Sequence, residues 1–156
     1  MHLQVSKKRV LRTISKGLDF PTQLIFDTAG NLYVANSDKK FVKVYAPGSN
    51  SVLRTISQGV DDPTALSFDG QGNLYIANFD ASTITVYAPG STSVLRTISQ
   101  GVSSPVALTF DGSGNLYVAN SNRLGYGTVT VYSPGSNSVL RTISGVLRPG
   151  AMGFGP

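Results

Sequence analysis

The chain has 156 residues and a formal net charge of +5, with 40% hydrophobic and 13% charged residues. This length supports one domain or part of one, and the composition is that of a packed, weakly charged protein rather than a disordered one. The absence of cysteine excludes disulfides and thiol chemistry, and because no apolar run approaches ~18 residues we expect no membrane contact.

The first segment, residues 1–9, is interpreted as a flexible basic tail. Lys7, Lys8 and Arg9 supply three of the thirteen basic residues, and the only histidine, His2, lies in the same segment. The other ten basic residues are balanced by eight acidic ones, so the clustered basic face typical of nucleic-acid binding is missing. The first residues also lack the apolar core of a signal peptide. The sequence therefore predicts no nucleic-acid partner and leaves the compartment unknown.

Residues 10–15, Val-Leu-Arg-Thr-Ile-Ser, begin a repeat that fills the rest of the chain. The same six residues return at 52–57, 94–99 and 139–144, at spacings of 42, 42 and 45 residues. The last spacing is longer because the loop at 123–127 carries extra residues. Periods in this range are typical of propellers, solenoids or repeat arrays.

Each repeat contains four short runs with strand character. In the second copy they are 65–68, 74–77, 83–87 and 94–98, rich in β-branched and aromatic residues and bounded by Gly, Pro, Asn and Asp. No window shows helical periodicity of useful length. The segment 69–73, Asp-Gly-Gln-Gly-Asn, indicates a hairpin between the first two strands because its residues tolerate positive φ.

Four strands per repeat at this period match the blades of a β-propeller. We label the strands A to D, outward from the propeller axis. The sequence predicts an all-β fold, a β-propeller of four-stranded antiparallel blades with three full blades per chain. The partial propeller spans residues 10–156, with blades at about 22–57, 64–99 and 106–144.

The repeat resembles the NHL-type repeat of bacterial and eukaryotic propellers over roughly residues 10–154. The resemblance rests on the pattern Pro-x-x-Leu-x-Phe-Asp-x-x-Gly-Asn-Leu-Tyr-Val-Ala-Asn, followed by Val-x-Val-Tyr. The chain departs from the family where Asn36, Asn78 and Asn120 stand at a position that is commonly Asp. The resemblance implies propeller architecture and leaves the activity open, because the family includes protein-binding, RNA-binding, lyase and calcium-dependent hydrolase members.

The repeats stop short of a closed ring. Besides the three blades, the chain carries an orphan strand D at 10–15 and a degraded orphan strand A at 150–154. Propellers have about four to eight blades, so two apolar blade faces would meet water, which favours association. We therefore expect oligomerisation to complete the ring, with a six-bladed homodimer favoured.

The orphan strand at 10–15 has the sequence of 139–144, so the two segments compete for the same place in such a dimer. Two alternatives remain open. One is a dimer of seven or eight blades that uses the orphan strands, and the other is a fragment of a longer parent.

The blades offer little for catalysis. They contain no histidine or cysteine, and the motifs of a nucleophile elbow, a Walker loop or a zinc site are absent. Serine and threonine abound, but a nucleophile needs a base within hydrogen-bond reach. Asp27, Asp69 and Asp111 lie in Asp-x-x-Gly-Asn turns, where we expect them to accept backbone N–H groups rather than to bind calcium.

Two sets of repeated side chains are predicted to be structural. The mid-strand tyrosines are expected to pack between blades, and the outer-strand arginines to discourage edge pairing, with a basic rim for RNA as the alternative. The residues are Tyr33, Tyr75 and Tyr117, and Arg12, Arg54, Arg96 and Arg141.

The D–A and B–C loops are predicted to emerge together around the mouth of the central channel. The repeats differ most there, as either a binding face or unconstrained loops would show. Oxygen-rich loops can hold Ca²⁺, for which Asp61 and Asp62 are the candidates; no other cofactor is expected. The asparagines that end strand B either line the mouth or bond the loop backbone. The candidate ligand-binding residues are Asp19, Asp38, Asp61, Asp62, Asp80, Asn36, Asn78 and Asn120.

Three functional hypotheses follow from these patterns. The first is a non-catalytic propeller scaffold or binding module that assembles with itself and binds a ligand or a protein at the loop face. The second is a calcium-dependent hydrolase, lactonase-like or lyase-like enzyme. The third is a designed or excised fragment with no activity beyond folding. The lack of catalytic motifs favours the first.

Overall fold

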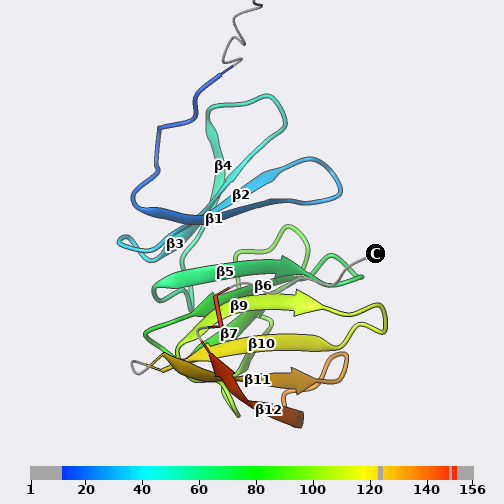
Figure 1. Cartoon of the computed structure of the whole chain (residues 1–156). Helices are drawn as coiled ribbons and strands as arrows, with labels where there is room; N and C mark the ends of the chain where they lie inside the picture. The colour runs from blue at the N-terminus through cyan, green and yellow to red at the C-terminus, as the bar shows by residue number, and fades with distance from the viewer. Residues whose placement is uncertain (1–11, 123–124, 148, 151–156) are drawn as a thin grey trace, which may run out of the picture.

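The computed structural model describes residues 12–122, 125–147 and 149–150 of the chain. Within these residues the chain forms twelve β-strands and no helix, so this part holds no helix that could span a membrane. The strands make three four-stranded sheets, each built from consecutive strands paired antiparallel (Figure 1). The predicted all-β fold with three four-stranded blades is confirmed.

All three sheets repeat the strand order A to D. The first contains β1 (Pro21–Phe26), β2 (Leu32–Asn36), β3 (Phe41–Tyr45) and β4 (Val52–Ile56). The second contains β5 (Pro63–Phe68), β6 (Leu74–Asn78), β7 (Thr83–Tyr87) and β8 (Arg96–Ile98). The third contains β9 (Pro105–Phe110), β10 (Leu116–Ser121), β11 (Tyr126–Tyr132) and β12 (Val139–Leu147). Strand β12 runs past the predicted blade end at residue 144, because Val146 and Leu147 still pair with β11.

The predicted orphan strands lie largely outside the described residues. Residues 10, 11 and 151–154 fall there, as does the predicted tail 1–9. Residues 12–15 and Gly150 are described, and in the single chain they belong to no strand. The orphan strands and the domain boundaries therefore stay predictions.

The hairpin between strands A and B is built around an aspartate. In the first blade the Asp27 carboxylate accepts hydrogen bonds from the backbone N–H groups of Ala29 at 3.0 Å and Asn31 at 2.8 Å, and from the Asn31 side-chain amide at 2.8 Å. Asp69 and Asp111 accept the equivalent bonds in their own hairpins. The turn role predicted for these three aspartates is confirmed.

The apolar cores lie between neighbouring blades. One buried cluster joins the first blade to the second, and another joins the second to the third. Along the inner edge, β5 contacts both β1 and β9 (Figure 1). Edge-to-face ring pairs mark both joins, Tyr33 with Phe68 and Tyr75 with Phe110, at centroid separations of 5.1 and 5.0 Å. The interblade packing predicted for these two tyrosines is confirmed.

The outer-strand arginines are tied into the blades. The guanidinium groups of Arg54, Arg96 and Arg141 lie 5.4 to 5.9 Å from the ring centroid of the strand-B tyrosine in their own blade. Each also donates a hydrogen bond to that tyrosine's hydroxyl. Arg96 reaches the third blade as well, where it donates to the carbonyls of Gly135 and Ser136 at 2.9 and 3.0 Å. This anchoring goes beyond the edge protection expected from the sequence.

The connections fall at two opposite ends of the blades. The D–A and B–C loops share one end, since the Ser37 N–H donates to the Phe20 carbonyl at 3.2 Å. The A–B hairpins and C–D turns share the other, where a Cβ on Gly30 would lie 3.4 Å from Pro47. We call the first end the loop face and the second the hairpin face. The predicted grouping of the D–A and B–C loops is confirmed.

The outward side of the first blade is apolar and uncovered. Leu24 and Phe26 of β1 are both 60% exposed. Leu66 and Leu108, at the positions equivalent to Leu24 in the next two blades, are only 2% and 8% exposed. The difference arises because each later blade packs on the blade before it, whereas β1 has no such neighbour among the residues that the structure describes.

Candidate functional site

The three predicted asparagines are buried on strands β2, β6 and β10. Asn36 and Asn78 are 0% exposed and Asn120 is 3% exposed. The Asn36 side-chain oxygen accepts the backbone N–H of Asp19 at 2.8 Å, that of Asn78 accepts the N–H of Asp61 at 3.0 Å, and Asn120 makes the equivalent bond. The structure thus confirms that these amides bond the D–A loop backbone. Contact with a ligand stays a prediction.

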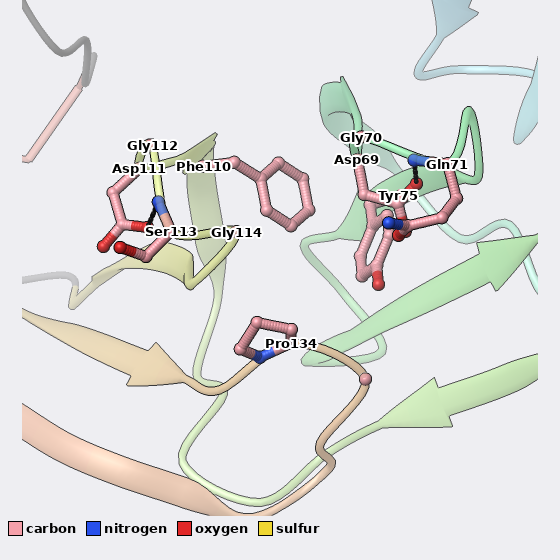
Figure 2. Close-up of a pocket in the computed structure, with 11 residues that line it drawn as sticks. Asp69, Gly70, Gln71, Tyr75, Phe110, Asp111, Gly112, Ser113, Gly114 and Pro134 are labelled. Atoms are coloured by element: carbon pink, nitrogen blue, oxygen red, sulfur yellow. Dashed lines mark hydrogen bonds between the residues drawn. The ribbon is translucent and has the colours of Figure 1, made fainter.

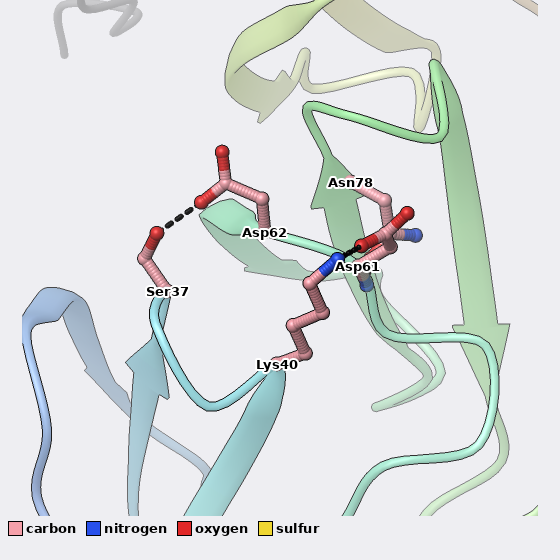
Figure 3. Close-up of polar contacts among 5 residues, drawn as sticks. All are labelled: Ser37, Lys40, Asp61, Asp62 and Asn78. Atoms are coloured by element: carbon pink, nitrogen blue, oxygen red, sulfur yellow. Dashed lines mark hydrogen bonds and ion pairs between the residues drawn. The ribbon is translucent and has the colours of Figure 1, made fainter.

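Polar side chains of the first two blades meet on the loop face (Figure 3). Lys40, directly before β3, pairs with Asp61 of the next D–A loop at 2.5 Å, and the hydroxyl of Ser37 donates a hydrogen bond to Asp62. The hydrogen bond and charge of Asp61 raise the pKa of Lys40, and the charges of Asp80 and Asp62 act in the same direction. Carboxylates of the second blade and its D–A loop therefore lie near one ammonium group of the first blade.

The remaining predicted aspartates are more exposed. Asp19 pairs with Lys39 at 3.6 Å, with side-chain exposures of 45% and 62%, so this ion pair contributes little to stability. Asp38 and Asp80 occupy equivalent exposed positions in the first and second B–C loops. All five predicted aspartates thus belong to the loop face, and ligand binding by them stays a prediction.

A cavity of about 370 Å³ opens on the loop face between the second and third blades. It is lined by Phe79, Asp80, Ser104, Ser121 and Asn122. A carboxylate, an aromatic ring and hydroxyl groups around one hollow suit a ligand with a cationic head and an apolar stem. Sequence reasoning singled out only Asp80, because the lining comes from separate loops. The one available signal was Phe79, which stands where the other copies have serine.

The hairpin face carries two cavities that repeat with the blades. One of about 520 Å³ lies between the first two A–B hairpins, and one of about 330 Å³, bordered by Phe110, lies between the next two (Figure 2). Burial raises the pKa of Asp27, but hydrogen bonds from Asn31 and nearby groups outweigh it and leave that pKa lowered. At Asp111 the hydrogen bond from Asn115 lowers the pKa. Because these carboxylates already accept the hairpins' own donors, they offer little to a ligand.

The donor set for a metal ion is small. Among the residues that the structure describes, no group of three or more His, Cys, Asp or Glu side chains could hold a metal. Of the two calcium candidates, Asp61 faces the ammonium group of Lys40, and Asp62 accepts the hydroxyl of Ser37. A cation at Asp61 would have to displace Lys40. Calcium binding stays an untested prediction.

No protein-family model matches the chain, and no curated protein matches it in sequence. Solved structures do match its fold. The chain is similar to hydrazine synthase of Kuenenia stuttgartiensis, with a TM-score of 0.73 and 17% identity, over 94% of this chain and 40% of that one. It is similar to the WD40 β-propeller domain of Doa1, with a TM-score of 0.68 and 20% identity, over 80% of this chain and 40% of that one.

A third similar structure is the computationally designed Ika4 protein, with a TM-score of 0.74 and 20% identity, over 95% of this chain and 88% of that one. At these identities the likeness shows the fold alone. Together with the three four-stranded sheets it confirms propeller architecture, while the NHL type of the repeat stays a hypothesis. The chain spans about 40% of the length of the first two matching chains.

Proposed function

Because the chain folds as a partial β-propeller, we propose that it is a non-catalytic scaffold or binding module of NHL-type repeats. In this proposal it assembles with a second copy into a closed ring and binds a ligand or a protein at the loop face. The observation that carries the proposal is the 60% exposure of Leu24, whose equivalents Leu66 and Leu108 are buried.

Several physical arguments support the assembly. Apolar surface left in water costs roughly 25 cal/mol per Å², and repeat proteins draw much of their stability from contacts between neighbours. A head-to-tail contact that closes by rotation covers both open faces. The starts of successive A strands also line one cavity of about 220 Å³, which includes Thr22, Thr64, Val106 and Gly150. Convergence of these strands on a common axis supports a ring rather than an open array.

The loop face supports a cationic ligand. The carboxylates of Asp61, Asp62 and Asp80 lie near the single ammonium group of Lys40, so negative charge is in excess there. Asp80 also lines the cavity of about 370 Å³ beside Phe79. An aromatic ring and a carboxylate together suit the stem and head of a lysine or arginine side chain.

The two alternative functions are a calcium-dependent hydrolase or lyase and a fragment with no activity beyond folding. No observation favours a calcium-dependent hydrolase or a lyase, since the Asp61 carboxylate pairs with Lys40. A fragment with no activity beyond folding is supported by the similarity to the designed Ika4 protein, over 88% of that protein's length. Ligand binding at the loop face separates this alternative from a binding module.

Light scattering coupled to size exclusion tests the assembly. We expect a mass of twice the chain's 16.4 kDa at micromolar concentration. A mass of 16.4 kDa at every concentration would contradict the proposal. The measurement should be repeated with Ca²⁺, and a mass that changes only with calcium would favour the metal-dependent alternative.

Amide NMR with tetra-lysine as the probe tests the loop-face site. We expect chemical-shift changes at Phe79, Asp80 and Ser104, and weaker binding for Asp80→Asn. Asp38→Asn, at the equivalent position of the first blade and outside this cavity, should weaken binding less than Asp80→Asn does, and tetra-glutamate should cause no change. Equal shifts with both peptides, or shifts confined to the hairpin face, would contradict a cation-binding loop face.

A further inference from the structure

Residues 12–18, which precede the first blade, lie on that blade as the internal D–A connections lie on the later ones. The hydroxyl of Tyr45 in β3 donates to the carbonyl of Lys16 at 2.8 Å. The equivalent tyrosine hydroxyls of the next two blades donate to the carbonyls of Gln58 and Gln100 at 2.5 and 2.6 Å. The three acceptors are spaced by 42 residues. Residues 12–18 therefore take the place of a connection that arrives from an earlier blade.

Arg12 extends this equivalence to the outer strand. Its guanidinium lies beside the C–D turn of the first blade, 4.0 Å from where a Cβ on Gly48 would stand. Arg96 of β8 takes the equivalent place on the third blade, where it donates to the carbonyl of Gly135 at 2.9 Å. Arg12 and Arg96 are equivalent in the repeat. Arg12 thus stands where the outer-strand arginine of a preceding blade would stand.

Strand β12, which has the same starting sequence as 10–15, is weakly packed. Its residues 140–145 are all exposed. Ile143 is 41% exposed, whereas the equivalent residues Ile56 and Ile98 are 1% and 0% exposed. Release of β12 from β11 would therefore give up little apolar burial.

We infer that the ring closes by strand exchange, in which residues 12–15 of one copy replace residues 141–144 of the other in the fourth strand of its third blade. The inference rests on the proposed self-assembly and specifies which strand pairing connects the two copies. Residues 16–20 then lead from the partner's third blade into β1, as the internal connections lead from one blade to the next. The exchange is reciprocal, so one pair of copies forms two identical joins.

The contacts at the Gly48 turn favour the exchange over a contact that leaves β12 in place. The incoming and outgoing segments have the same sequence, so the sheet pairings lost and gained over those residues are equivalent, and only the pairings of Val146 and Leu147 with β11 are lost in addition. A join with or without the exchange covers Leu24 and Phe26, so this burial favours the assembly rather than the exchange itself. If β12 stayed, the partner's Arg141 would compete with Arg12 for the turn at Gly48.

Paired cysteines test this register, since the chain contains no cysteine of its own. Thr142 of β12 is opposite Thr130 of β11, as Thr55 is opposite Lys43 in the first blade. Thr13 is the equivalent residue of the segment 10–15. After exchange, the double variant Thr13→Cys with Thr130→Cys is therefore expected to form a disulfide-linked dimer of twice the chain mass under mild oxidation. Ile14→Cys with Val129→Cys is a second pair, in case a cysteine at the buried Thr130 disturbs folding.

The matched control is Thr130→Cys with Thr142→Cys, which reports a retained β12. We expect little intrachain disulfide from this variant in the assembled fraction. A dimer by light scattering that gives the intrachain bond and no link through Thr13 or Ile14 would overturn the exchange while leaving the assembly intact. A monomer at every concentration would overturn the assembly itself, and an intrachain bond between Thr13→Cys and Thr130→Cys would overturn closure by two copies.

Discussion

At the loop face, buried asparagine side chains hold the D–A loops by hydrogen bonds. Asn78 accepts the Asp61 backbone N–H at 3.0 Å, and its amide nitrogen donates to the hydroxyls of Thr83 and Thr85 at 3.3 and 3.1 Å. The side chain is 0% exposed, so no water can replace these partners. In the second blade a short polar side chain on β6 therefore links the D–A loop to β7.

The variant Asn78→Ala should lower the free energy of unfolding by about 2 kcal/mol, because it leaves the Asp61 N–H without its partner. Urea unfolding measures the change. The exposed Asn50 provides the control, and Asn50→Ala should change stability by less than about 0.5 kcal/mol. Equal effects from both variants would contradict a specific role for the buried amide.

A second single-residue prediction concerns Gly101 in the D–A loop. Its φ is +71°, and a Cβ there would lie 2.6 Å from Val139 and 3.2 Å from Thr130. Gly101→Ala should therefore destabilise the chain by roughly 2 kcal/mol, through backbone strain and steric conflict together. Gly112→Ala is the matched control, since nothing lies within 4 Å of its Cβ position. Thermal unfolding of the two variants measures the difference, and similar melting temperatures would contradict the predicted strain at Gly101.

Among the structural elements, the A–B hairpin has the clearest dependence on pH. Burial acts to raise the pKa of Asp27, but the hydrogen bonds that each carboxylate accepts within its hairpin leave the pKa of both Asp27 and Asp111 lowered from 3.8. A lowered folded-state pKa means that these bonds stabilise the fold above the unfolded-state value. Their contribution is lost as the pH falls through the folded-state value.

We therefore expect the melting temperature to hold steady down to about pH 4 and to fall below it. Asp111→Asn should flatten part of this fall, because an amide in that turn does not titrate. The exposed Asn50, which carries no titratable group, offers the comparison, and Asn50→Ala should leave the profile unchanged. Coincident profiles for all three proteins would show that the hairpins are not responsible.

Strands and turns could be predicted from the sequence, whereas contacts between loops of different blades could not. The repeat period, the strand composition and the Asp-x-x-Gly-Asn turns were enough to predict the blades and the turn role of Asp27, since these depend on local chemistry. The contact of Lys40 with Asp61 and the cavity beside Phe79 join loops of different blades. Such contacts depend on how one blade is rotated against the next, which no single repeat encodes. The position of Arg54 over Tyr33 was missed because a long side chain can turn either way.

For the whole molecule, two exposed leucines can show which surface forms the contact between the two copies. Leu24 is 60% exposed and Leu53 is 53% exposed, but only the position of Leu24 is buried in the second blade, where Leu66 is 2% exposed and Leu95, the equivalent of Leu53, is 59% exposed. Leu24→Ser should therefore raise the dimer dissociation constant at least tenfold, about 1.4 kcal/mol, because it places a hydroxyl in the join. Leu53→Ser should leave it unchanged. Analytical ultracentrifugation measures both, and equal dissociation constants would place the join elsewhere.

Near-identical repeats also create a problem for the order of folding. Residues 52–57, 94–99 and 139–144 present one strand sequence to three blades, so a strand that pairs with the wrong blade finds nearly native hydrogen bonds. Such mispaired states are kinetic traps, and their unpaired strand edges favour aggregation with other chains. The Lys40–Asp61 pair has no counterpart at the next join, where Ser82 and Ser103 stand instead. The loop contacts therefore differ from one join to the next, and they favour the native pairing of the blades during folding.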